Sequence, residues 1–248
     1  MPTTTFTQSG IAKKQPKLHE VFWLDQCAAD VPSADAWLSP QELVLLNRLR
    51  FEKRRADWRL GRWTAKRCVR ACCGTQPLCE IEILPAKDGA PEIRLQNAPS
   101  ELTISLSHRN GFAICAIAAS SVSVGCDLEV IESRSDAFIA DYFTPEEQKI
   151  VFDADLSAQP LLANLIWSAK ESALKAMRTG LRYDTRSLSV TLLDRMRTQS
   201  EGDWHPLQVH GQEGKMFRGW WQADGSMLRT VVASPFPGIP VKAKFSGP

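Results

Sequence analysis

The sequence has no long apolar run, no excess of one charge and no paired cysteine motif, and each absence excludes a class of protein. No stretch of the 248 residues approaches the roughly 18 consecutive apolar residues that a membrane-spanning helix needs. Lysine and arginine number 30 and acidic residues 28, so the net charge of +2 indicates no particular partner. Because the sequence has no such apolar run, we expect no membrane partner. The hydrophobic fraction of 44% is that of a globular chain long enough to bury its own core.

The cysteine pattern and the N-terminal residues indicate the cellular compartment of the protein. Seven cysteines are present, but their spacing forms no paired C-x-x-C zinc motif. We interpret them as reduced thiols that serve as small apolar side chains, which is usual in the cytosol. Residues 1–17 lack the apolar core of a secretory signal. The predicted location is therefore cytoplasmic.

Hydrophobic periodicity predicts alternating strands and helices. Strands are expected at 21–25, 83–95 (a turn-interrupted pair), 102–107, 112–118, 121–130, 187–193, 204–209, 216–222 and 227–233; helices are expected from Ser39-Pro40, over 54–73, from Thr144 and over 161–178. The Asn110-Gly111 dipeptide predicts a tight hairpin turn. The fold class expected is α+β (α/β) in two similar halves, 1–121 and 122–248. We find no sequence-level repeat, and the tail from Pro235 is expected to be loop.

The strand at 121–130 places two carboxylates on one face. Asp127 and Glu129 project together, roughly 6.5–7 Å apart along the strand, because strand side chains alternate with a period of two. Like charges at this separation repel unless a cation or solvent intervenes. Oxygen ligands with this reach suit a hard ion such as magnesium. The alternative interpretation is a strand with one solvated face.

The helix at 161–178 carries Glu171 and Lys175 opposite its apolar stripe, with Trp167 one turn earlier. One interpretation is a surface salt bridge, which contributes little stability. The other is a face that looks into a cleft, where Glu171 supplies a third oxygen ligand and Lys175 a cation for a phosphate. In the preceding segment, Thr144 and Glu147 form a capping box, so Glu147 is expected to have a structural role.

Positive charge is concentrated between Arg48 and Arg70, which contains ten lysine or arginine residues and two acids. In helical phase the basic side chains share a stripe: Arg55, Arg59, Arg62 and Lys66. Such a field suits nucleic acid, a phosphorylated small ligand or an acidic protein. The sequence pI of about 8.2 and the lack of a reader motif disfavour nucleic acid. Ser107-His108 ends the strand at 102–107 and opens a loop, a common place for ligand contacts.

These motifs together resemble a known family. G-C-D-L-E at 125–129, F-x-x-x-E at 143–147 and W-S-A-K-E-S-A-L-K at 167–175 are similar to motifs of the 4′-phosphopantetheinyl transferases, of the monomeric surfactin-synthetase-activating (Sfp-like) type. S-L-S-H at 105–108 is similar to the strand that leads to the coenzyme A-contacting histidine of that family, and G-R at 61–62, in a basic helix, is similar to its N-terminal half. The resemblance spans roughly residues 45–190.

The resemblance implies a fold and a reaction. Two similar halves, each a small antiparallel sheet packed with helices, would be related by a pseudo-twofold axis with coenzyme A in the cleft between them. The protein would be a monomer that transfers 4′-phosphopantetheine from coenzyme A to a serine hydroxyl of an apo acyl or peptidyl carrier protein. Adenosine 3′,5′-bisphosphate would be released. The carrier is expected to bind at loops such as 131–142.

The resemblance also implies roles for single residues. Magnesium would be held by Asp127, Glu129 and Glu171. Lys175 would neutralise charge on the leaving pyrophosphate, and Glu171 would be the base for the carrier serine. Coenzyme A would contact a further set of side chains: Lys53, Ser107, His108 and Lys175. The family often has Gly-Lys-Pro where this chain has Gly89-Ala90-Pro91, so Lys87 is expected to supply the missing cation.

Two other functions remain open on the sequence alone. The first is a non-catalytic coenzyme A- or carrier-binding module with a vestigial metal site. The second is a basic nucleic-acid-binding domain. The set of three carboxylates favours the transferase, because a protein that only binds coenzyme A does not need all three.

Overall fold

Antiparallel sheets packed against helices make up the protein, as a computed structural model shows. The structure describes residues 17, 19–74, 76–96, 98–193 and 203–244. The first part of the chain forms β1 (Phe22–Cys27), α1 (Pro40–Arg48), α2 (Glu52–Cys73), β2 (Ile81–Pro85), β3 (Pro91–Leu95), β4 (Ala98–Pro99), β5 (Leu102–Arg109) and β6 (Phe112–Ala119). The predicted α+β class is confirmed.

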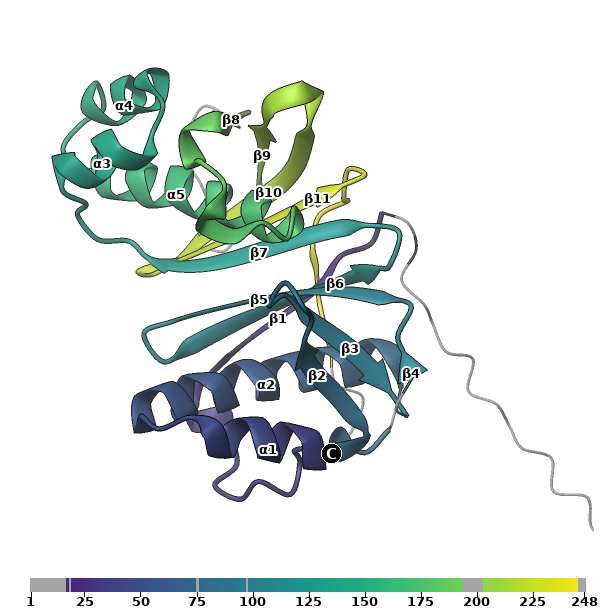
Figure 1. Ribbon diagram of the computed structural model, residues 1–248. Coiled ribbons are helices and arrows are strands. Elements are labelled where there is room, and N and C mark those ends of the chain that lie inside the picture. The colour runs from purple at the N-terminus through teal and green to yellow at the C-terminus, as the bar shows by residue number, and fades with distance from the viewer. Residues whose placement is uncertain (1–16, 18, 75, 97, 194–202, 245–248) are drawn as a thin grey trace, which may run out of the picture.

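The second part of the chain places its sheet opposite the first (Figure 1). It forms β7 (Ser123–Val130), α3 (Asp136–Tyr142), α4 (Pro145–Phe152), α5 (Gln159–Ala176), β8 (Ser189–Leu192), β9 (His205–His210), β10 (Met216–Asp224), β11 (Met227–Ser234) and β12 (Val241–Lys242). The strand orders are β12-β1-β6-β5, β2-β3-β4 and β7-β11-β10-β9-β8. The long helix α2 packs on the first sheet and α5 on the last.

The β5–β6 hairpin forms at the predicted turn. Asn110 and Gly111 have φ of 50° and 77°, the left-handed pair that a two-residue hairpin turn requires. Arg109 consequently pairs with Phe112. This hairpin brings Ser107 and His108 to the end of β5 that faces β7.

The two long helices are anchored by the same buried arrangement. Ser39 caps α1 and forms a capping box with Glu42, whose second carboxylate oxygen accepts from the backbone N–H of Ile83 at 3.0 Å. The Lys66 ammonium of α2 pairs with Glu42 and donates to the Trp37 carbonyl at 3.0 Å. Both charged side chains are 0% exposed, so each depends on the other and on these hydrogen bonds.

The second half repeats these contacts with different residues. Thr144 caps α4 and forms a capping box with Glu147, which accepts from the backbone N–H of Val190 at 2.8 Å. Lys170 of α5 pairs with Glu147 and donates to the Tyr142 carbonyl at 3.0 Å. The structural role predicted for Glu147 is confirmed.

The repeated contacts reveal a sequence repeat that the sequence analysis missed. W-T-A-K at 63–66 matches W-S-A-K at 167–170, and S-P-Q-E at 39–42 matches T-P-E-E at 144–147. Each match is four residues long and lies in a different sequence context. Only the buried pairing shows that the two matches belong together.

A glycine allows α5 to lie directly on β7. A Cβ atom at Gly125 would lie 1.8 Å from the carbonyl oxygen of Ser172, so no other residue fits there without moving the helix. Ser168 and Ser172 further tie α5 to the sheet, since both hydroxyls lie within 2.8 Å of the Thr230 hydroxyl on β11. This packing fixes which side of α5 faces the first half.

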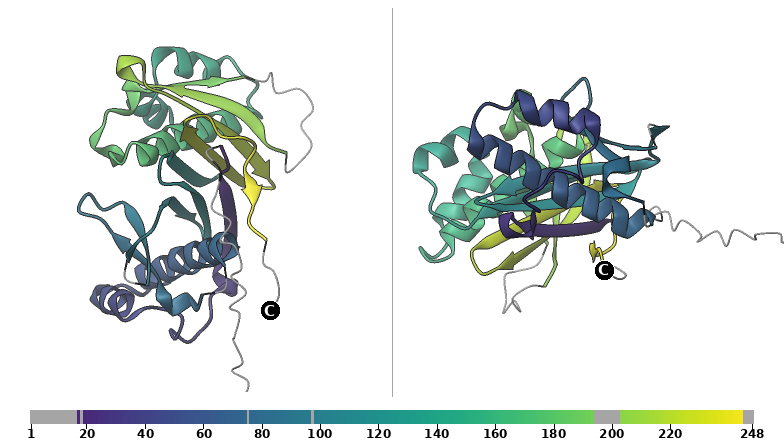
Figure 2. Two further views of the ribbon diagram at one scale, coloured as in Figure 1. Left: turned by 90° about the vertical axis from the view of Figure 1, so that its right-hand side faces the viewer. Right: turned by 90° about the horizontal axis from the view of Figure 1, so that it is seen from below.

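Two segments differ from the sequence expectation. The tail expected as loop contains β12, which runs parallel to β1 with Phe22 opposite Val241. Strand β12 therefore lies in the first sheet, beside β1 (Figure 2). Helix α3 was not expected either, because its seven residues show no clear apolar period. None of the helices in the described ranges is long and apolar enough to cross a membrane.

Candidate active site

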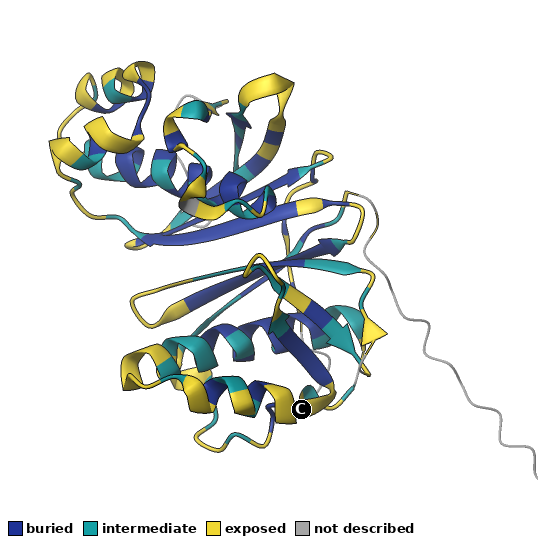
Figure 3. Cartoon of the chain, in the orientation of Figure 1, coloured by how far each residue is buried: buried dark blue, intermediate teal, exposed yellow. Residues whose placement is uncertain are grey.

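Strands β5 and β7 face each other across the two halves and bring together residues distant in sequence. The backbone N–H of Cys126 donates to the Ser105 hydroxyl at 3.0 Å. Two residues further along, the Ser107 hydroxyl donates to Oδ1 of Asp127 at 2.7 Å. β7 is buried over six consecutive residues, so neither of its faces is solvated, whereas β5 is buried only at Ile104 and Ser105 and is exposed at His108 and Arg109 (Figure 3).

Asp127 lies at the centre of the junction and is 4% exposed. Its Oδ1 also accepts from the Lys175 ammonium at 2.7 Å, and that ammonium donates to the Cys126 carbonyl at 3.2 Å. Burial alone would raise the pKa of Asp127, but Lys175 and the Ser107 hydroxyl outweigh it and lower that pKa. Asp127 also raises the pKa of Lys175 against the effect of burial. The two side chains are therefore a charged pair at neutral pH.

Glu171 faces the same junction from α5 but has no partner for one oxygen. Its Oε1 atom is buried and accepts no hydrogen bond. Among the ion pairs of the described residues, Glu171 and Lys175 do not bond to each other, so the surface salt bridge considered for this helix does not form. Burial, together with Asp127 and Glu129, raises the pKa of Glu171 despite the proximity of Lys175. The carboxyl group therefore holds its proton more tightly than usual.

Glu129 is 9% exposed and both its carboxylate oxygens are occupied. Oε2 accepts from Arg134 at 3.0 Å and lies 3.4 Å from Nε of Arg109. Oε1 accepts from the indole N–H of Trp167 at 3.1 Å, which explains why a tryptophan lies on this face of α5. Burial and the nearby Asp127 raise the pKa of Glu129 even so.

The three predicted metal ligands therefore share one region without forming a closed site. No three acidic, histidine or cysteine side chains among the described residues are close enough together to hold a metal ion. Two buried carboxylate oxygens of these three residues nevertheless lack a hydrogen-bond partner, Oδ2 of Asp127 and Oε1 of Glu171. Buried polar atoms are nearly always hydrogen-bonded, and Asp127 is close enough to raise the pKa of Glu171. Two unpartnered carboxylate oxygens in this arrangement fit a divalent cation with oxygen ligands.

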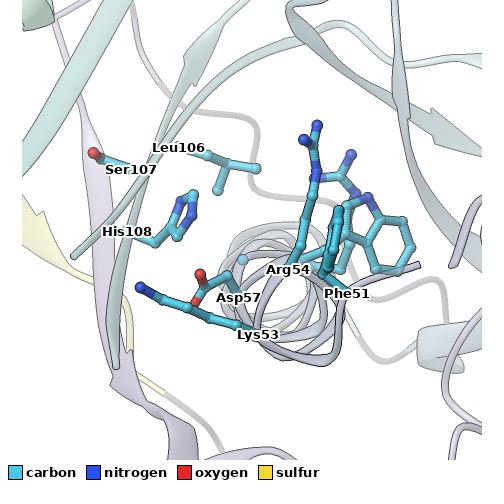
Figure 4. A pocket seen from close by; sticks show the side chains of 10 residues that line it. Phe51, Lys53, Arg54, Asp57, Leu106, Ser107 and His108 are labelled. Atoms are coloured by element: carbon cyan, nitrogen blue, oxygen red, sulfur yellow. The ribbon is translucent and has the colours of Figure 1, made fainter. Parts of the chain in front are cut away.

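A cavity of about 530 Å³ opens beside this junction, between α2 and β5. Its lining includes Lys53, Arg54, Arg62, Ser107 and His108. Lys53 reaches from α2 towards His108 with Asp57 nearby (Figure 4). Partial burial, with Lys175 and Arg62 close by, lowers the pKa of His108, so the ring is a neutral donor at pH 7. The predicted group of Lys53, Ser107 and His108 is therefore brought together, in surroundings that suit phosphate.

A second cavity of about 790 Å³ lies further along β5, between the β2–β3 turn and the end of α5. Lys87 is exposed on that turn and is not part of this lining, whereas Asp88 and Arg178 are. Arg178 binds Asp88 through two hydrogen bonds of 2.8 and 3.1 Å and Glu92 through one of 2.9 Å. Arg178 of the second half thus binds the acids on both sides of the Gly89-Ala90-Pro91 segment.

The basic stripe predicted for α2 has mainly structural roles. Arg55 donates to the Leu46 carbonyl at 2.7 Å, and Arg59 donates to Asp35 at 2.8 Å. Lys66 is buried with Glu42. Only Arg62 of the four lines the cavity. The expectation that this stripe presents one positive field was wrong, because three of its members hold α1 and the preceding loop against α2.

Sequence reasoning missed the arginines that surround Glu129 and the cation near Pro91. Arg109 follows His108 directly, and Arg134 follows β7 by four residues, so proximity in sequence to the named motifs was the available signal. Arg178 lies one helical turn after Lys175 and was overlooked because it falls beyond the last residue of α5.

Comparison with known proteins identifies the part of the chain that carries these side chains. Residues 123–223 match the family model of the 4′-phosphopantetheinyl transferase superfamily. That stretch contains Asp127, Glu129, Glu171 and Lys175. None of the curated protein sequences matches the chain.

Two solved structures are similar over two fifths of the chain. A holo-(acyl-carrier-protein) synthase from Bacillus anthracis str. Ames, in complex with CoA (3′,5′-ADP), is 18% identical with a TM-score of 0.35, covering 40% of this chain and 93% of that one. The holo-[acyl-carrier-protein] synthase of Helicobacter pylori, in complex with coenzyme A, is 22% identical with a TM-score of 0.32, covering 40% of this chain and 98% of that one.

Proposed function

We propose that this protein is a magnesium-dependent 4′-phosphopantetheinyl transferase of the Sfp-like type, which modifies a serine of an apo carrier protein. The observation that carries the proposal is the pair of orphaned carboxylate oxygens of Asp127 and Glu171, buried beside Lys175 and next to a cationic cavity. The match of residues 123–223 to the superfamily model supports it. We also propose that the chain divides into halves 1–121 and 122–248, that the protein is a monomer and that it is cytoplasmic.

Coenzyme A is proposed to bind along β5. The cavity beside β5 is lined by the cations Lys53, Arg54 and Arg62 and by His108 as a neutral donor, and it suits the phosphates of the nucleotide. Ser107 and Lys175 would contact the pyrophosphate, because both already bind Asp127 at its edge. Lys87 remains a predicted contact of coenzyme A.

Asp127, Glu129 and Glu171 are the proposed magnesium ligands. Bound magnesium would neutralise charge on the pyrophosphate and so stabilise the phosphoryl transfer. Asp127 and Glu171 have a free oxygen for this purpose, whereas Glu129 would share an oxygen that Arg134 and Arg109 now occupy.

The protein's own groups account for the remaining steps. The carrier serine oxygen forms a bond to the phosphorus that bears the pantetheine arm, and the bond from that phosphorus to the adenosine bisphosphate oxygen breaks. Glu171 accepts the serine proton, since its raised pKa makes its carboxylate a stronger base than that of an ordinary glutamate. Lys175 offsets the charge that develops on the departing phosphate.

The test is transfer in vitro with an Asp127→Asn variant. The wild-type protein, incubated with coenzyme A, magnesium and a panel of apo carriers, should add one phosphopantetheine to the serine, as measured by intact-protein mass. Asp127→Asn should lose at least about a hundredfold of this activity. The variant should keep the wild-type circular dichroism spectrum and should lose manganese binding measured by electron paramagnetic resonance.

Asp136→Asn is the matched control, because Asp136 is an exposed acid on α3 outside the junction. It should retain wild-type transfer and manganese binding. Full activity of Asp127→Asn would contradict the metal assignment. Binding of coenzyme A by the wild-type protein without transfer to any carrier would identify a binding module instead of an enzyme.

A further inference from the structure

The turn between α1 and α2 presents an unusual concentration of free positive charge. We call residues 48–54 the α1–α2 tip. Its four cations are all exposed: Arg48, Arg50, Lys53 and Arg54. In the part of the chain that the structure describes, none of the four takes part in a salt bridge, whereas Arg59, Arg109 and Arg178 each do.

The tip also exposes an aromatic ring at the N-cap of α2, a position where a polar residue is usual. Phe51 is 75% exposed and occupies the N-cap position of α2, where it makes no side-chain hydrogen bond to the helix. Helices α1, α3 and α4 are capped in the expected way, by Ser39, Ser135 and Thr144. An N-cap serine, threonine, aspartate or asparagine would stabilise α2, and phenylalanine does not.

The charges of the tip oppose the helix as well. Lys53 and Arg54 lie in the first turn of α2, where the positive end of the helix dipole disfavours cations. Glu52 is the single acid of that turn. An uncapped helix start, an exposed ring and cations at the positive end all reduce stability. Residues that break local rules together indicate a site with another purpose.

The tip adjoins the candidate active site. Phe51, Lys53 and Arg54 line the same cavity as Ser107, whose hydroxyl donates to Asp127 at 2.7 Å (Figure 4). A partner that covers the tip therefore lies at the mouth of the cavity. Exposed aromatic and arginine side chains are the types enriched at the energetic centres of protein interfaces.

The segment from β7 to α3 has the opposite charge. Asp136 and Asp141 are exposed there, Glu132 pairs with Arg109 at 2.7 Å, and the one arginine of the segment, Arg134, is turned inward to Glu129 and Asn164. An acidic protein would be repelled by this segment and attracted by the tip. The two surfaces thus differ in the partner they fit.

We propose that the α1–α2 tip is the docking surface for an acidic acceptor protein, with Phe51 as its apolar anchor. The inference rests on the proposed function and specifies which face the protein substrate approaches. It replaces the loops at 131–142, expected from the sequence, by a surface of the first half. Arg48 and Arg50 attract the acidic partner, and Phe51 enters an apolar depression on it.

The first test reverses charge outside the cavity. Arg48→Glu with Arg50→Glu should raise the KM for an apo carrier by about tenfold and leave kcat and the KM for coenzyme A unchanged. Lys215→Glu, which alters one exposed charge on the second half, is the control and should change none of these. An unchanged KM for the carrier in the double variant would overturn the proposal.

The second test separates binding from stability at Phe51. Phe51→Ser should raise the thermal midpoint by roughly 2–4 °C, because serine caps α2. The same change should weaken the affinity for the apo carrier by about tenfold, measured by direct titration. A lower midpoint with unchanged affinity would mean that Phe51 is structural, and would overturn its role as an anchor.

The two proposals fail in different ways. If the wild-type protein transfers no phosphopantetheine to any carrier, the proposed function fails and this inference fails with it. If transfer proceeds but the tip variants keep the wild-type KM and affinity, only the docking surface is wrong. Titration with a DNA duplex covers the remaining class of partner: loss of DNA binding in the tip variants, without loss of carrier affinity, would overturn the proposal.

Discussion

Helices α2 and α5 are held in the same way, yet only α5 carries residues of the proposed metal site. Each is fixed by a buried lysine that pairs with a capping-box glutamate, Lys66 with Glu42 and Lys170 with Glu147. The residue after Lys170 is Glu171, whereas the residue after Lys66 is Arg67. Five positions after each lysine stand Lys175 and Ala71 respectively. The scaffold is common to both halves, and function is decided by the positions next to it.

The difference extends to what each half offers a ligand. The second half supplies the carboxylates Asp127, Glu129 and Glu171, and the first half supplies the cations of the cavity beside β5. A metal and an anionic nucleotide need both kinds of group at one place. The junction of β5 with β7 brings these two kinds of group together, and the proposed function depends on both.

The largest expected difference between α5 and α2 is the effect on transfer activity of changing Glu171 or Arg67, which occupy matching positions. Glu171→Gln should lower kcat for transfer by about 10²- to 10⁴-fold, because the amide neither accepts the serine proton nor binds a metal as a carboxylate does. Arg67→Gln, at the matching position of α2, should keep activity within about twofold of wild type. Steady-state transfer assays give both values. Equal losses in the two variants would show that the halves share the catalytic work.

A second prediction concerns the two buried pairs. Lys66→Met and Lys170→Met should each lower the free energy of unfolding by about 3–5 kcal/mol, because each leaves a buried glutamate without its counter-charge. Urea denaturation gives these values. Of the two, only Lys170→Met should also weaken manganese binding, since Glu171 follows Lys170 on α5. A large cost at one lysine and none at the other would contradict the equivalence of the pairs.

The smallest effect expected is a dependence of stability on pH. The pKa of Glu171 is raised by burial, so the folded protein binds a proton that the unfolded chain releases. Stability from this group is full below its ordinary pKa of 4.5 and is lost as pH rises through the raised value. Metal-free Glu171→Gln should therefore gain thermal stability over wild type more at about pH 8 than at about pH 5. Arg67→Gln should show no such trend. The measurement is the thermal midpoint of each variant between about pH 5 and about pH 8.

Much of the fold follows from local patterns in the sequence. The hairpin at Asn110-Gly111, the caps at Ser39 and Thr144, and the strand β7 all appear where the sequence predicts them, although β7 is buried on both faces. These features depend on residues within one or two turns of one another. Helix α3 and strand β12 do not, because α3 is short and β12 exists only through its pairing with β1.

The candidate site was predictable in composition but not in its contacts. The shared face of Asp127 and Glu129 follows from the strand period, and the resemblance to a family grouped them with Glu171. No pattern in the sequence indicates that Arg134 and Arg109 form ion pairs with Glu129. Nor does any pattern indicate that Lys175 binds Asp127 and not Glu171. Such choices depend on long-range packing, and the basic stripe of α2 was misinterpreted for the same reason.

The return of the chain to its first strand has a consequence for how the protein is divided. Lys242, on β12, and Arg229, on β11, both bind Asp25 of β1, at 2.8 and 2.6 Å. A fragment cut at the boundary near residue 121 would leave this aspartate largely buried without either cation, and would remove the parallel neighbour of β1. The first sheet thus owes one of its strands to the second half of the chain, and a first half without that strand would be incomplete.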